Sequence, residues 1–100
     1  MGIFSGNSEN NPFHDAHKRM AENIMSAEGD SVDETFVRQM IEHHRGAIDM
    51  SGILLREGSD PELKQMVQKS VSDQRKEIGE LEQWLQTHGL SRETASSPNE

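Results

Sequence analysis

The sequence contains no cysteine among its 100 residues, which excludes disulfide bonds and thiolate metal sites and removes any redox indication of the compartment. It also lacks long apolar runs: one of the longest, GILL at residues 52–55, is far too short to span a bilayer. The first ten residues, MGIFSGNSEN, have neither the basic start nor the apolar core of a signal peptide. We therefore expect a soluble chain with no membrane partner.

Positive charge is also scarce, because 10 Lys and Arg residues stand against 18 Asp and Glu residues, for a formal net charge of -8. Nucleic acids and anionic membranes select clustered Lys and Arg, so we expect no nucleic-acid partner, and a cation or a basic ligand fits better. Apolar residues make up 31% of a short chain, which is too little for a large core. Long helices in this chain should need a partner surface.

Capping signals predict an all-α fold with helices at about 12–27, 32–57 and 61–88. The starts are marked by Asn11-Pro12, by the capping box of Ser31 and Glu34, and by Asp60-Pro61. Glycines just beyond the expected ends predict the helix stops, with a left-handed residue after the first: Gly29, Gly58 and Gly89. The organisation expected is a flexible arm at 1–11, one helical domain at 12–89 and a disordered tail at 90–100.

Apolar spacing predicts which faces of the two longer helices meet. In the helix at 32–57 the expected core stripe is Phe36, Met40, His43, Ala47, Met50 and Leu54. In the helix at 61–88 it is Leu63, Val67, Ser70, Gln74, Glu77, Leu81 and Trp84. The short loop between them predicts an antiparallel hairpin, which sets Gln74 opposite the two histidines and Glu77 opposite Met40. The acidic side chains assigned to solvated faces are Asp33, Glu42, Asp49, Glu80 and Glu82.

The helix at 12–27 is too short to cover a hairpin whose helices are each about 40 Å long. Two copies packed through the same face would form a four-helix bundle and bring their histidine levels near a twofold axis. We therefore expect a homodimer.

The segment MIEHHRGAIDM, residues 40–50, suggests a metal site without thiolates. Met40, His43 and His44 are three or four residues apart and can converge on one side of a helix, whereas Met50 lies two turns away and is more typical of a core. Thioether sulfur and neutral imidazole suit Cu(I) or Ag(I) best, with Cu(II) or Zn(II) as alternatives through histidines alone. His17 and Met20, in HDAHKRM, offer further ligands from the first helix.

Two other interpretations compete with a metal site. One histidine donating to Gln74 or Glu77 would make a hydrogen-bond network, and the protein would then be a structural or interaction module. The same two residues can instead orient a ligating imidazole, so the two interpretations are compatible. A di-iron enzyme would need Glu-x-x-His on two helices, which is absent here, and no other catalytic motif appears.

Two segments, FVRQMIEHHRGAIDMS and then QRKEIGELEQWL, resemble the hallmark helices of the bacterial domain-of-unknown-function family number 305, over residues 33 to 88. The resemblance implies a ferritin-like helical bundle, frequently exported, with several members associated with copper or silver handling. It implies a ligand cluster of Met40, His43, His44 and Met50, with Gln74 and Glu77 beside it. Leu81 stands where the family usually has Met, which removes a soft ligand. Many relatives carry a second helix pair, so the single pair here favours a dimer.

Overall fold

The computed structural model describes residues 11–92, which form three α-helices and no strand: α1 (His14–Ser26), α2 (Val32–Glu57) and α3 (Pro61–Thr87). The all-α prediction is therefore confirmed, and the starts of α2 and α3 are those predicted. None of the described helices is long and apolar enough to cross a membrane. The predicted arm and tail lie almost entirely in residues 1–10 and 93–100, outside the described residues.

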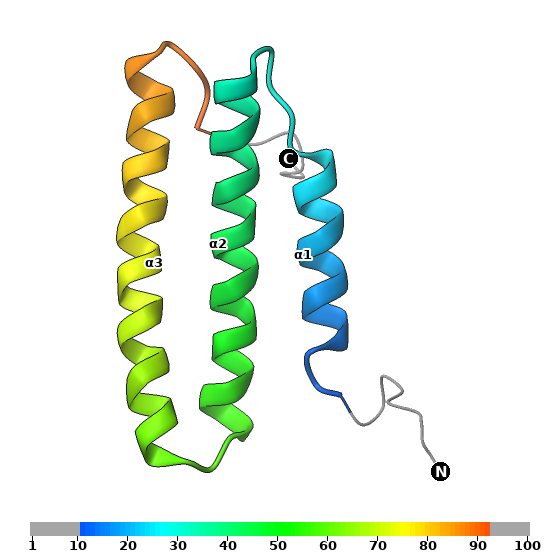
Figure 1. Cartoon of the computed structure of the whole chain (residues 1–100), viewed down its shortest axis with the longest axis vertical. Coiled ribbons are helices and arrows are strands. Elements are labelled where there is room, and N and C mark those ends of the chain that lie inside the picture. The colour runs from blue at the N-terminus through cyan, green and yellow to red at the C-terminus, as the bar shows by residue number, and fades with distance from the viewer. Residues whose placement is uncertain (1–10, 93–100) are drawn as a thin grey trace.

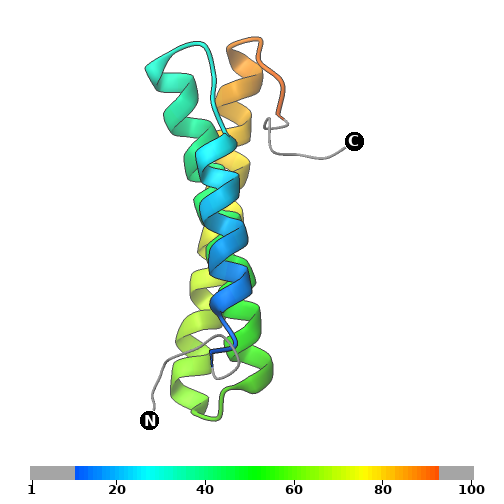
Figure 2. The same ribbon diagram turned by 90° about the vertical axis from the view of Figure 1, so that its right-hand side faces the viewer.

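The helices form a single layer with α2 in the middle (Figure 1). α2 packs against α1 on one side and against α3 on the other, and each helix runs antiparallel to the next (Figure 1). Seen from the side, the three helices overlap along one line (Figure 2). α2 therefore keeps two faces that no described helix covers.

The start of α2 is fixed by side chains that bind the amides a helix leaves free. Ser31 Oγ accepts a hydrogen bond from the Glu34 amide at 3.0 Å, as the capping box predicts. Glu34 Oε1 accepts from the Asp30 amide at 3.0 Å, and its Oε2 accepts from Arg38 Nε at 2.7 Å. The Asp30 amide above all, with Arg38 beside it, lowers the pKa of Glu34 below its ordinary value of 4.5.

The predicted bounds of α1, and the role predicted for Gly29, are only partly right. α1 begins at His14, two residues later than predicted, because the Asn11 side chain accepts the Phe13 amide at 2.9 Å in a turn before the helix. Among residues 11–92, the one glycine with a positive φ is Gly89, at 73°. The left-handed conformation expected at Gly29 is therefore wrong. Gly29 is needed for space instead, since a Cβ there would overlap the Glu34 side chain.

The core lies along the line where α2 and α3 touch. Val37, Ile41 and Leu85 are buried there, and partly buried apolar side chains pack around them: Ile78, Leu81, Trp84 and Leu90. No residue of the predicted stripe of α2 belongs to this core: Phe36 is 59% exposed, and Met40, Ala47, Met50 and Leu54 are half-buried. Two packed helices bury side chains only along the narrow seam between them. In α2 this seam is formed by Val37 and Ile41, which lie beside the predicted stripe, and the stripe itself faces outward.

α1 meets α2 where Met20 packs on Gly46. A Cβ on Gly46 would overlap the Met20 side chain, including its Cβ, so a close backbone approach requires glycine at this position. Gly79 of α3, by contrast, has nothing within 4 Å of where its Cβ would lie.

We predict opposite effects of the same substitution at these two glycines. Gly46→Ala should lower the free energy of unfolding by about 1–3 kcal/mol, because the methyl group overpacks the contact with Met20. Gly79→Ala should raise the free energy of unfolding by about 0.5–1 kcal/mol, because alanine has a higher helix propensity than glycine and the position is exposed. Urea unfolding followed by circular dichroism measures both, and equal effects at the two sites would contradict the packing of α1 described above.

A second prediction concerns acid unfolding. Because the pKa of Glu34 is lowered in the folded state, its contribution to stability is complete above the ordinary pKa of 4.5 and is lost as the pH falls through the lower folded value. Glu34→Gln should therefore be less stable at neutral pH and should lose less stability on acidification. Thermal unfolding from pH 7 to pH 2 measures this slope, and a Glu34→Gln variant with the wild-type slope would contradict the role of Glu34.

Candidate functional site

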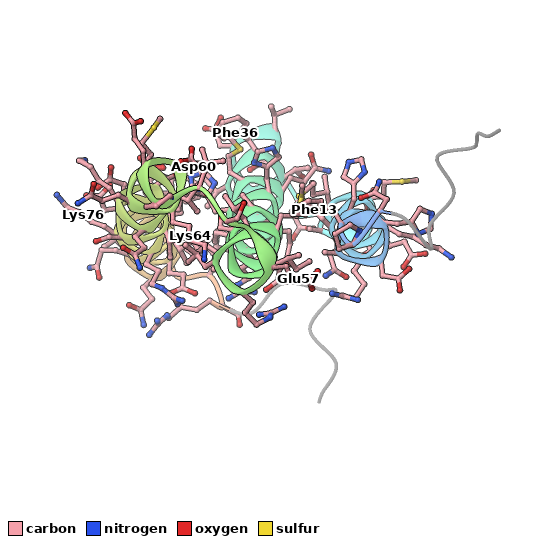
Figure 3. The ribbon with its side chains drawn as sticks, turned by 90° about the horizontal axis from the view of Figure 1, so that it is seen from below. Phe13, Phe36, Glu57, Asp60, Lys64 and Lys76 are labelled. Atoms are coloured by element: carbon pink, nitrogen blue, oxygen red, sulfur yellow. The ribbon has the colours of Figure 1, made fainter. Side chains whose placement is uncertain are left out.

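The two uncovered faces of α2 carry different chemistry. The front face holds the outward stripe of Phe36, Met40, His43, Ala47, Met50 and Leu54, which recur at steps of four and three residues. The back face, on the other side of the layer, carries charged side chains at similar steps: Arg38, Glu42, Arg45, Asp49 and Arg56. Phe36 projects on one side of the helix layer in the view along the helices (Figure 3). His43 thus belongs to an apolar face and not to a charged one.

His44 is held by hydrogen bonds at both ring nitrogens. Its Nδ1 lies 2.9 Å from the carbonyl oxygen of Met40, which only accepts, so Nδ1 carries the hydrogen. Its Nε2 lies 2.6 Å from Glu77 Oε1, within hydrogen-bond distance. The His44 side chain is 13% exposed and that of Glu77 54%. In this arrangement both ring nitrogens of His44 are engaged in hydrogen bonds, so a metal would have to displace one of them.

Of the two residues predicted to bond to a histidine, the structure uses Glu77 and not Gln74. Gln74 was expected opposite His43 and His44, but its Nε2 donates to Ser70 Oγ on its own helix at 3.0 Å. Glu77, expected opposite Met40, instead bonds to His44, one turn further along α2. Loop length sets helix levels only to within about a turn, and a glutamate side chain is long enough to bridge that difference.

His43 faces a different direction from its neighbour, because successive residues of an α-helix are about 100° apart. It is exposed, and its ring meets the His44 ring edge to face with centroids 6.1 Å apart. Met40 precedes it by three residues and Met50 follows it by seven on the same face, and both are half-buried. The front face therefore presents a row of one imidazole between two thioethers.

The candidates on α1 lie apart from this row. Met20 is engaged in packing on Gly46. His17 is exposed and lies one turn earlier in α1, which in antiparallel helices places it level with Asp49 and Met50 of α2. His17 thus lies at the level of Met50 but on the neighbouring helix, and Met20 serves to hold α1 against α2.

Nitrogen and oxygen ligands do not form a cluster of their own in the described residues. Within residues 11–92, no group of three His, Asp or Glu side chains is placed to hold a metal ion.

Sequence reasoning missed an ionic network on the back face. Glu42 and Glu82, assigned to solvated faces, have side chains only 4% and 14% exposed. Arg45 bridges them, donating to Glu42 Oε2 at 3.0 Å and to Glu82 Oε2 at 3.2 Å. The pair of Glu42 and Arg45 could have been predicted from their three-residue spacing on one helix. The bond from Arg45 to Glu82 could not, because it depends on how α3 packs against α2.

A family model described as Domain of unknown function (DUF305) matches residues 6–96. The chain belongs to this family. Membership confirms the resemblance carried by the two helical motifs, and the DUF305 match extends beyond both of them to include α1. The search of curated proteins found no match.

The two adjacent histidines of this DUF305 protein should respond differently to truncation. His44→Ala removes two hydrogen bonds in a largely buried position and should lower the free energy of unfolding by about 1 kcal/mol. His43→Ala removes an exposed ring and should change it by less than about 0.5 kcal/mol. Chemical unfolding of the metal-free protein measures both, and an equal or reversed loss would contradict the assigned roles.

Proposed function

We propose that this DUF305 protein binds a soft transition-metal ion, Cu(I) in preference and also Ag(I), without catalysing a reaction. The observation that carries the proposal is the pairing of Met40 and His43, three residues apart on an open face of a long helix. Side chains at this spacing have Cβ atoms about 5–6 Å apart, a separation that one ion can bridge. Such a protein would serve in metal storage, buffering or resistance.

The donor set favours a soft ion. Thioether sulfur prefers Cu(I) and Ag(I), and imidazole accepts both. Cu(II) or Zn(II) would rely on the histidines, but His44 is already bonded to Glu77 and to the Met40 carbonyl. Those two bonds fix the helix turn that carries Met40 and His43. Residues that surround a metal site commonly orient its ligands in this way.

One thioether and one imidazole leave the coordination of an ion incomplete, and a second copy of the chain can complete it. The front of the hairpin exposes large apolar side chains that a monomer leaves in water, with Phe36 59%, Leu63 40% and Met66 64% exposed. Two helices about 10 Å wide and about 40 Å long offer about 800 Å² per copy, the size of a standard interface. Packing two fronts together would give a ferritin-like four-helix bundle.

A structural or interaction module is the second candidate, and one observation favours it. The bond between His44 and Glu77 joins α2 to α3 without any metal. Such a polar contact can fix the alignment of two helices, so the histidine level would set the register of the bundle.

Native mass spectrometry of the metal-free full chain, titrated with Ag(I) and with Cu(I) under reducing conditions, tests the proposal. We expect stoichiometric retention, weakened at least tenfold by His43→Ala or Met40→Leu. His14→Ala and Met25→Leu, exposed residues of α1, are matched controls and should bind like wild type. No retained metal, or equal losses in variants and controls, would leave the structural module as the better account.

The same spectra report assembly. Phe36→Glu places a charge in the proposed interface and should shift the protein to monomer, while Met25→Glu, at an even more exposed apolar residue outside the front face, should not. A wild-type chain that stays monomeric at every concentration would refute the bundle and leave the metal-binding test unaffected.

A further inference from the structure

A hollow of about 660 Å³ opens on the back of the helix layer, where all three helices contribute to its lining. α1 supplies Arg19, α3 supplies Arg75, and α2 supplies Glu42, Arg45 and Asp49 between them. The rest of the lining comes from Met20, Asn23, Gly46, Ile48 and Ile78. This hollow is separate from the front face.

The charges of the hollow divide into paired and unpaired groups. Arg45 is satisfied by Glu42 and Glu82, and Glu82 also binds Arg92 at 2.8 Å. In the part of the chain that the structure describes, Arg19, Arg75 and Asp49 take part in no hydrogen bond or ion pair. Two free guanidinium groups and one free carboxylate thus line one hollow in a chain whose net charge is -8.

The two free arginines lie within about one turn of each other along α2. Met20 contacts Gly46, so Arg19 in the antiparallel α1 lies beside residue 47. Glu77 bonds to His44, so Arg75, two residues earlier in α3, lies within about one turn of residue 46. Neighbouring helix axes are about 8–10 Å apart, which sets α1 and α3 about 16–20 Å apart across α2. Long side chains from both walls reduce that span to the size of a small molecule.

We propose that the hollow binds a small organic dicarboxylate that also carries a hydroxyl or amino group. Each guanidinium presents a planar fork that matches a carboxylate, so Arg19 and Arg75 bind one carboxylate each. Asp49 accepts a hydrogen bond from the hydroxyl or amino group between them. The binding site uses the back face only, so it stays open when the front face is covered and does not depend on metal binding.

Isothermal titration of the full chain at constant ionic strength tests the site with two probes. Malate and succinate share a four-carbon dicarboxylate frame, and only malate has a hydroxyl group. Malate should bind at least threefold more tightly than succinate. Arg19→Gln or Arg75→Gln should lower the affinity for malate at least tenfold. Arg56→Gln changes an arginine on the same face of α2 but outside the hollow, and should alter the affinity less than twofold.

Asp49→Ala removes the acceptor of this hydrogen bond and should abolish the preference for malate over succinate. Circular dichroism of each variant confirms folding, and amide shifts of Gly46 and Ile78 during titration locate the ligand. The proposal is overturned if neither acid gives saturable binding, if Arg56→Gln weakens binding as much as the other two, or if the shifts map elsewhere.

Discussion

A layer of three helices encloses apolar side chains only along the two lines where neighbouring helices touch. Here those lines are the seam of α2 with α3, around Val37, Ile41 and Leu85, and the contact of α1 with α2 at Met20 and Gly46. α2 is therefore fixed from both sides while two of its faces remain open. One open face is apolar with a row of sulfur and imidazole groups, and the other is charged, so the same constraint creates both candidate surfaces.

Local rules predicted much of this fold. The start of α2 follows from Ser31 and Glu34, its end from Gly58, and the start of α3 from Pro61, and each of these effects depends on the nearest few residues. Contacts between helices were less predictable, because helical periodicity identifies an apolar stripe but does not say whether a neighbour in the same chain covers it. Phe36 therefore belongs to the predicted stripe and yet is exposed. Glu42 appeared solvated because its burial depends on Arg45 and on α3.

The histidine pair shows how adjacent residues of one type acquire different roles. One helical step turns His44 toward α3, where Glu77 and the Met40 carbonyl hold both ring nitrogens, and leaves His43 on the open face. From the sequence, the two histidines and Met40 were expected at one level of the helix. The hydrogen bonds of His44 then identify it as a supporting residue and leave His43 as the candidate ligand. The proposed donor set is thereby reduced to Met40 and His43, with Met50 further along the same face.

Methionine-methyl NMR during titration with Ag(I) tests that donor set most directly, because each of the six methionines gives its own signal. The account predicts a saturable shift of the Met40 methyl group, a smaller one at Met50, and unchanged signals for Met25 on α1 and for Met20 in its packing contact with Gly46. Unchanged Met40, or equal shifts of Met40 and the exposed Met25, would contradict it.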